Sequence, residues 1–348
     1  MSRASYLGAR GRGMSFAKSH AQASMSYARA AAPTTTAVRW PGYYRPMTQE
    51  QLVRIGFNVD DRPASLRRFL ELLGPAYDAL QSARSVRVDL TSAQFLGPAA
   101  SVALVGLDLL AGLHGVTATF LPPAGPPALL GYLRFSGLEQ RLFQGSPPDP
   151  AHPSSVTIPV ARFTKPNIGI VVSPVVALVQ RSLRIDEDGR LALEMCVNET
   201  MYNVHHHSGS RIGGVVAARY QSGATRHGLR RPVGEVRIAM LDHGDGIPTV
   251  VQRAHRELTD ADAMTWATIA GNTTNPAGRN LGQGLSNLSM LTRSHGGSLF
   301  IFSGSIGATQ QGDQRLSVTR LATAFPGTLV CCSLRIPQAQ RDDGVRIG

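Results

Sequence analysis

The chain has 348 residues, of which 43% are apolar and 17% are charged. Disordered chains are poorer in apolar groups and richer in charge, so this composition excludes a disordered protein, and the length suits two domains. The formal charge of +12 is concentrated at the start: residues 1–49 hold seven basic residues and no acidic one, which leaves +5 for the rest and disfavours a folded nucleic-acid surface.

Residues 1–48 form a basic tail rich in Ser, Ala and Arg, and we expect it to be disordered. It lacks the continuous apolar segment of a secretory signal, so we do not expect export. The same composition also suits an organellar transit peptide, or a start codon assigned too early, with Met14, Met25 and Met47 as later starts. Nucleic-acid binding, if the protein has any, is expected only through this tail.

The apolar stretches and the cysteines both favour a cytoplasmic protein. The longest apolar stretch, residues 98–116, is interrupted by Asp108 and His114, so no membrane span is predicted. Three cysteines lie inside apolar patterns, which predicts buried thiols in a reducing compartment. These are Cys196, Cys331 and Cys332.

The first half of the body alternates between strand and helix patterns. Residues 86–91, "VRVDLT", predict a strand, and a helix is expected from about Pro98 to Leu113, with proline at the tolerated first turn. A second strand follows at 116–121, and "LLGYLRFSGLEQRLF" has another helical pattern. This alternation predicts an α/β unit with helices packed on a sheet.

The order and wording of this region resemble the STAS-like domains of bacterial regulators, over residues 49–145. In regulatory members of that family a short turn carries a phosphorylated serine, whereas the equivalent turn here is Gly97-Pro98-Ala99-Ala100. Ser101 is expected to lie already in the helix, where it is a poor substitute. A small α/β interaction domain without chemistry of its own is therefore favoured over a phosphoswitch.

A Pro-rich linker is expected at 146–164, and a helix is expected from about Arg190 to His207. Glu199, Asn203 and His207 are spaced i, i+4, i+8, which stacks them on one helical face. The three successive histidines, 205 to 207, point about 100° apart on a helix and cannot all reach one ion. The H-E-x-x-H zinc pattern is absent. A carboxylate and an amide oxygen one turn apart instead suit Mg²⁺ bound together with phosphates.

A second motif, "VRIAMLDHGDGIP", places Asp242 at the end of an apolar strand, followed by Gly244 and Gly246. Glycines let the backbone approach a flat ligand, and a carboxylate at a strand end can accept a hydrogen bond from an exocyclic amine such as that of adenine. A calcium loop is the competing interpretation. It fails because Arg253 occupies the twelfth position, where a bidentate Glu is required.

A third motif, "GRNLGQGLSNLSMLTRSHGG", places Gly282 and Gly284 before leucines at helical spacing. The glycines are expected to open a helix whose free N–H groups can bind phosphate. It is not the dinucleotide fingerprint, because Asn287 stands where a third glycine is needed. A P-loop is also excluded, since neither lysine, Lys18 nor Lys165, follows its glycine pattern.

In this order, E-x-x-x-N, D-x-G-x-G and G-x-G-L, the three motifs resemble the N, G1 and G2 boxes of the GHKL ATPases, the superfamily of gyrase, Hsp90, histidine kinases and MutL. The type it resembles most is the bacterial anti-sigma-factor regulators. The match covers residues 165–340, and 341–348 are left as a tail. The resemblance implies an α/β fold in which the STAS-like domain precedes a two-layer, Bergerat-type sandwich with helices on one face of a mixed sheet.

The resemblance also implies roles for individual residues and the cofactors ATP and Mg²⁺. Glu199 is similar to the general base, Asn203 to the Mg²⁺ ligand and Asp242 to the acceptor for the adenine amine. The residues implied to line the base pocket and the phosphates are Gly244, Gly246, Gly282, Gln283, Gly284 and Leu285.

A lid is implied over Ile247–Leu281, with Arg279 as a phosphate contact. Many relatives place a lysine shortly after the Asn, whereas His206 stands near that position here, so the resemblance does not set the rate of phosphoryl transfer. The histidines are interpreted as surface or supporting groups rather than metal ligands.

The implied function is a cytoplasmic signalling or regulatory protein that uses Mg-ATP for phosphoryl transfer to a serine of a partner protein, or for conformational switching. The alternative is a non-catalytic, nucleotide-dependent docking module. A histidine kinase is less favoured, because none of His20, His114 and His152 lies in a suitable acceptor helix. A protein partner or phosphoryl acceptor is expected, no membrane is expected, and a homodimer is left open.

Overall fold

A computed structural model describes residues 50–148, 154–221, 234–274 and 282–335. The chain divides into two compact units, 1–46 and 47–348, and all described residues belong to the second. The basic tail expected at 1–48 and the C-terminal tail at 341–348 lie outside the described residues.

The N-terminal α/β layer, residues 50–148, is built on a three-stranded parallel sheet in the order β1-β2-β3. Its strands are β1 (Gln51–Arg54), β2 (Val86–Asp89) and β3 (Ala118–Leu121). Its helices are α1 (Pro63–Gln81), α2 (Pro98–Leu113), α3 (Pro127–Phe135) and α4 (Leu138–Phe143). The first three helices begin with a proline at a position where its missing N–H costs nothing. The helical pattern expected at 129–143 is divided by Gly137, whose φ of 75° ends one helix and starts the next.

The second sheet has five strands in the order β4-β5-β6-β8-β7. They are β4 (Thr157–Phe163), β5 (Gly214–Gln221), β6 (Glu235–Asp242), β7 (Ser298–Gln311) and β8 (Ser317–Arg335). Every pairing is antiparallel, so the expectation of a mixed sheet was wrong, although the α/β class is confirmed. Strand β4 falls inside the stretch expected to be a linker, so the sheet begins earlier in the chain than the motifs indicated.

Helical segments connect these strands. They are η1 (Lys165–Asn167), α5 (Ile168–Leu183), α6 (Glu187–Asn203), η2 (Val204–Ser208), α7 (Ile247–Ala254), α8 (Asp260–Ala267) and α9 (Gly284–Ser294). Asp186 caps α6 by accepting a hydrogen bond from the Gly189 N–H at 2.9 Å, which starts the helix a few residues before the expected Arg190. At its other end α6 continues into a π-helical turn, η2, which contains the three histidines.

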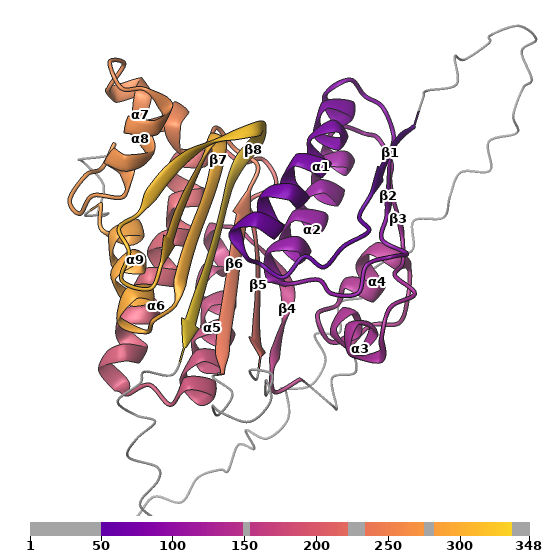
Figure 1. Cartoon of the computed structure of the whole chain (residues 1–348), viewed down its shortest axis with the longest axis horizontal. Coiled ribbons are helices and arrows are strands. Elements are labelled where there is room, and N and C mark those ends of the chain that lie inside the picture. The colour runs from indigo at the N-terminus through magenta and orange to yellow at the C-terminus, as the bar shows by residue number, and fades with distance from the viewer. Residues whose placement is uncertain (1–49, 149–153, 222–233, 275–281, 336–348) are drawn as a thin grey trace, which may run out of the picture. The chain divides into compact units, whose positions relative to one another are not determined.

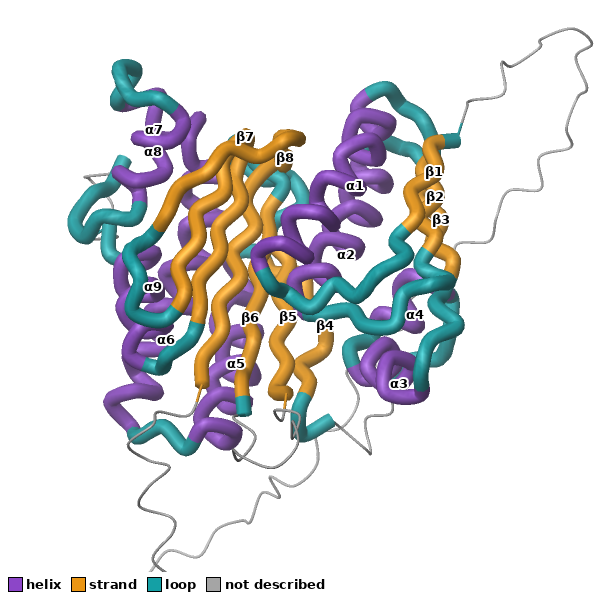
Figure 2. Tube along the Cα trace, in the orientation of Figure 1, coloured by secondary structure: helices purple, strands orange, loops and turns teal. Residues whose placement is uncertain are grey.

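Both faces of the five-stranded sheet are buried (Figures 1 and 2). In β6, Ile238 and Met240 face α5, α6 and α9, whereas Ala239 and Leu241 face the side covered by α1 and α2. The alternation follows from the two-residue period of a strand. Helices α5, α6 and α9, which belong to the same part of the chain as the sheet, lie on one face, as expected. The feature that was not predicted is the covering of the other face by α1 and α2 of the N-terminal layer. The N-terminal layer and this sheet share one hydrophobic core.

One helical run among the described residues, Lys165–Leu183, is long and apolar enough to cross a membrane by length and composition. This is weak evidence for a span, because Val172, Val175 and Val179 are buried in the core on the α5 side of the sheet. The run has the character of a core helix. The three cysteines are unbonded and buried, as expected.

Candidate functional site

One pocket brings the three motifs together. It lies between α6 with η2, the end of β6, the α7–α8 segment and the start of α9, and it holds about 990 Å³ of empty space including its open mouth. Eight of the nine sequence-predicted residues line it: Glu199, Asn203, Asp242, Gly246, Gly282, Gln283, Gly284 and Leu285.

Gly244 is the predicted residue that does not line the pocket. A Cβ at this position would lie 2.0 Å from the backbone oxygen of Ser208, so only glycine lets the loop after β6 pass this close to η2. The Asp245 N–H donates to the same Ser208 oxygen at 2.7 Å. Gly244 therefore shapes the pocket wall rather than forming its surface.

Asp242 is a buried carboxylate on the wall of the pocket. It ends β6, is 4% exposed and accepts a hydrogen bond from the Gly244 N–H at 2.8 Å. Burial raises the pKa of Asp242 to about 7, although the Gly244 N–H partly offsets this by stabilising the charged form. Thr328 is its cross-strand neighbour on β8 and also lines the pocket. The pair gives this end of the pocket an acceptor and a hydroxyl in apolar surroundings.

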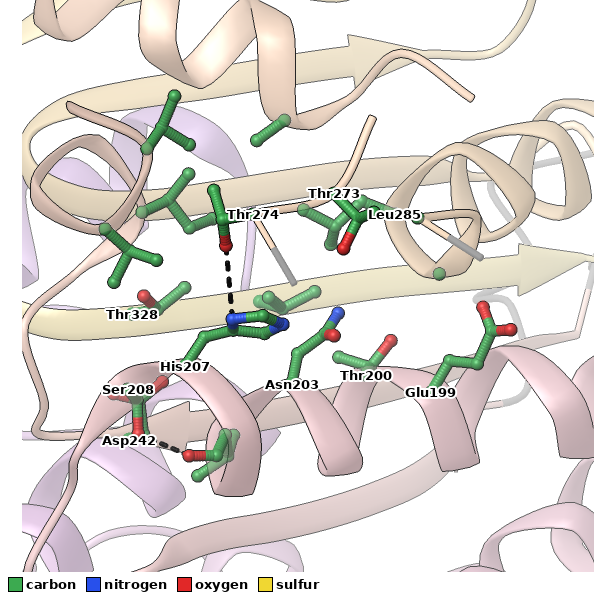
Figure 3. Close-up of a pocket in the computed structure, with 18 of the residues that line it drawn as sticks. Glu199, Thr200, Asn203, His207, Ser208, Asp242, Thr273, Thr274, Leu285 and Thr328 are labelled. Carbon is green, nitrogen blue, oxygen red and sulfur yellow. Dashed lines mark hydrogen bonds between the residues drawn. The ribbon is translucent and has the colours of Figure 1, made fainter. Parts of the chain in front are cut away.

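The pocket-facing side of α6 carries a row of polar side chains. Figure 3 shows Glu199, Thr200, Asn203 and His207 directed to the same side of this helix. The expected i, i+4 spacing of Glu199 and Asn203 is thus realised, and the π-helical turn brings His207 onto the same side. Burial raises the pKa of Glu199, whose Oε2 atom is buried and has no hydrogen-bond partner.

The N-terminus of α9 lies against this row. A Cβ on Gly284, the first residue of α9, would lie 3.1 to 3.3 Å from atoms of Glu199 and Asn203. Gly282, with φ of +65°, turns the chain into the helix, and a Cβ there would lie 2.3 Å from the Asn272 oxygen. The first N–H groups of a helix have no acceptor within it, so this end of the pocket can bind an anion.

The segment expected to form a lid is described as far as residue 274. It contains α7 and α8, and Trp266 and Thr273 line the pocket. The Thr274 Oγ1 lies 3.3 Å from the His207 Nδ1, which connects this segment to η2 across the pocket (Figure 3). Arg279, suggested as a phosphate contact, lies outside the described residues.

The three histidines do not converge. His205 and His206 are exposed, and His206 stacks on Tyr202 with ring centroids 5.8 Å apart. His207 is half-buried, and burial lowers its pKa, which favours the neutral ring. Among the described residues, no group of three His, Cys, Asp or Glu side chains could hold a metal ion.

Several pocket residues were not identified from the sequence. Thr200 is buried and resembles an ordinary helix residue in sequence, and Thr328 reaches the pocket only through its register with Asp242. Trp266 comes from α8, for which no motif was identified. For His207 the signal was present, since it was placed on the face of Glu199 and Asn203.

No family model matches the sequence, and the search of curated proteins found no match.

Proposed function

We propose that this protein binds ATP with Mg²⁺ in the pocket described above and acts as a signalling or regulatory protein of the GHKL type. The observation that carries the proposal is the convergence of three motifs. They are separated by more than thirty residues in the chain, yet eight of their nine selected residues line one pocket. An unrelated set of motifs has no reason to meet in this way.

The chemistry of the pocket fits an adenine nucleotide from one end to the other. At one end, Asp242 can accept a hydrogen bond from an exocyclic amine. At the other end, the start of α9 offers N–H groups to phosphate oxygens. Gly282 and Gly284 keep that end open, because side chains there would meet Asn272 and Glu199.

Two residues of α6 would act at the phosphate end. The Asn203 amide oxygen would be a ligand of Mg²⁺, which supplies positive charge against the phosphates when bound. The Glu199 carboxylate would accept the proton of an attacking water or serine hydroxyl. Burial raises its pKa, which makes this carboxylate a stronger proton acceptor than a solvent-exposed one.

Two mechanisms are compatible with this site. One is phosphoryl transfer to a serine of a partner protein, and the other is conformational switching through the α7–α8 segment. The competing function is a docking module that binds ATP without turnover. We favour an active site over a docking module because Glu199 Oε2 is buried without a partner beside α9. We expect the protein to act in the cytoplasm.

The test is titration calorimetry of the purified chain with ATP, with and without Mg²⁺. Asp242→Asn should weaken ATP binding by about 10- to 100-fold, because a hydrogen bond to a charged group contributes about 1.5–3 kcal/mol. Asn203→Ala should remove only the Mg²⁺-dependent part of the affinity. Failure of the wild-type protein to bind ATP would refute the proposal.

Turnover separates the mechanisms once binding is established. Phosphate release or transfer that Glu199→Gln abolishes, with ATP affinity retained, supports catalysis. Tight binding with no turnover in the wild-type protein supports the docking module.

A further inference from the structure

His243 lies between two residues of the pocket motif but faces away from the pocket. Asp242 precedes it and lines the pocket, whereas the His243 ring contacts Tyr77 of α1 and Phe325 of β8, with centroids 5.2 and 5.6 Å away. This follows from the alternation of side chains at a strand end. His243 thus connects the pocket motif to the N-terminal layer.

The hydrogen bonding of His243 fixes one side of its ring and leaves the other unpaired. Its Nδ1 atom lies 2.6 Å from the Pro326 carbonyl oxygen, which can only accept, so Nδ1 donates. Burial lowers the pKa of His243 to about 4, so the ring is neutral at pH 7 and Nε2 is an acceptor. This Nε2 atom is buried and has no partner.

Two helices of the N-terminal layer, α1 and α2, lie against His243 and its neighbour Leu241. The Tyr77 hydroxyl of α1 is also buried without a partner, and it is chemically complementary to a bare ring nitrogen. On α2, a Cβ at Gly106 would lie 2.9 Å from His243 Nε2 and 2.6 Å from Leu241 Cδ2. Leu241 is also part of the pocket wall, although its side chain packs on the α1–α2 side of the sheet. Hence α1 and α2 contact both chain neighbours of Asp242.

We propose that His243 and Leu241 are positioning residues through which α1 and α2 set the position of Asp242, so that the N-terminal layer controls the affinity of the pocket for the nucleotide base. The inference rests on the proposed function. A close-packed interface transmits displacement because it has no free volume to absorb it. Pairing of the Tyr77 hydroxyl with His243 Nε2 provides a second arrangement of the interface, in which two buried polar groups gain partners.

Two glycines of α2 give a matched test. Gly106→Ala adds a methyl group against His243 and Leu241, whereas Gly112→Ala, on the same helix, meets nothing within 4 Å. Calorimetry with Mg-ATP and with adenosine should show that Gly106→Ala weakens binding of both ligands equally, by at least about fivefold. The equal loss is expected because Asp242 holds the base and not the phosphates. Gly112→Ala should bind as the wild type does.

A double-mutant cycle tests the coupling from Tyr77 through His243 to Asp242 without changing Gly106. Tyr77→Ala should weaken adenosine binding in the wild-type background. In a His243→Asn background it should have no further effect, because Asn can still donate to the Pro326 oxygen but does not reach Tyr77. A purely structural role for Tyr77 would instead lower the melting temperature in both backgrounds without changing affinity.

The outcomes separate this inference from the proposed function. Wild-type binding with unchanged affinity in Gly106→Ala and Tyr77→Ala overturns the inference and leaves the proposed function standing. Equal losses from Tyr77→Ala in both His243 backgrounds also overturn it. Absence of nucleotide binding by the wild-type protein overturns both.

Discussion

Two buried carboxylates, Asp61 in the N-terminal layer and Asp242 at the pocket, have nearly the same electrostatic description. They are 3% and 4% exposed, each accepts a hydrogen bond from a backbone N–H, and burial raises the pKa of each to about 7. They differ in what surrounds the carboxyl group. Asp61 sits against Gly97, where a Cβ would lie 2.1 Å from its Oδ2, whereas Asp242 opens onto the pocket.

The comparison shows that a perturbed pKa does not by itself indicate a binding site. Asp61 accepts from the Ala99 N–H at 3.1 Å at the first turn of α2, and Arg237 lowers its pKa against the larger effect of burial. Its carboxylate contacts the start of α2 and has no open space beside it, so its role is structural. The pKa of Asp242 is raised to a similar value, but the space beside it can contain a ligand. We therefore expect changes at Asp61 to alter stability alone, and changes at Asp242 to alter binding as well as stability.

The largest expected effect is on stability as a function of pH. Unfolded Asp61 ionises near pH 3.8, whereas the folded carboxyl keeps its proton to about pH 7, so the free energy of unfolding should fall as pH rises between these values. At about 1.4 kcal/mol per pKa unit, the fall due to Asp61 is on the order of 4 kcal/mol. Urea unfolding between pH 4 and 8 measures it.

Asp61→Asn cannot ionise and tolerates the positive φ of this position. Its profile should therefore lack the part of the fall that Asp61 causes and keep the part that Asp242 causes. The exposed Asp313→Asn is the control and should keep the wild-type slope. An unchanged slope in Asp61→Asn would mean that Arg237 keeps the carboxylate ionised in the fold.

The second effect is on binding as a function of pH. An amine donor favours the ionised form of Asp242, so the affinity for adenosine should rise with pH, by up to about tenfold per unit below pH 7. Calorimetry in buffers of different ionisation enthalpy should detect the released proton. Asp242→Asn should abolish the slope and Asp61→Asn should keep it. A slope that survives in Asp242→Asn would assign the titration to another group.

The smallest effect concerns the hydroxyl of Ser101, the position next to the turn that lacks a phosphorylatable serine. Ser101 is buried in α2, with its Oγ 2.9 Å from the Gly97 oxygen and 2.8 Å from the Tyr132 hydroxyl. Ser101→Ala should lower the free energy of unfolding by about 1–2 kcal/mol and leave adenosine affinity unchanged. Adding Tyr132→Phe should recover part of the loss, because no unpaired hydroxyl then remains. A change of adenosine affinity in Ser101→Ala would contradict the assignment of a purely structural role to this part of the N-terminal layer.

Local features were easier to predict from the sequence than long-range packing, for physical reasons. Asp242 at a strand end and Gly284 at a helix start are local features, and both lie where expected. Helices α1 and α5 were not predicted: Pro75 and Pro174 stand inside them, and α5 is rich in valine, so local propensity opposes helix and burial overrides it. The covering of the sheet by α1 and α2 depends on contacts between distant residues, which periodicity does not reveal.

The π-helical turn at Val204–Ser208 has a consequence for how the chain can change in length. A π turn holds about one residue more than an α turn, and such turns are frequent at functional sites. If one histidine is deleted, the turn can return to α-helical spacing. Glu199 and Asn203, which lie upstream in α6, would then keep their positions. Related chains should accordingly differ by a single-residue insertion or deletion within the histidine tract, whereas the same change inside α6 would turn its polar row away from the pocket.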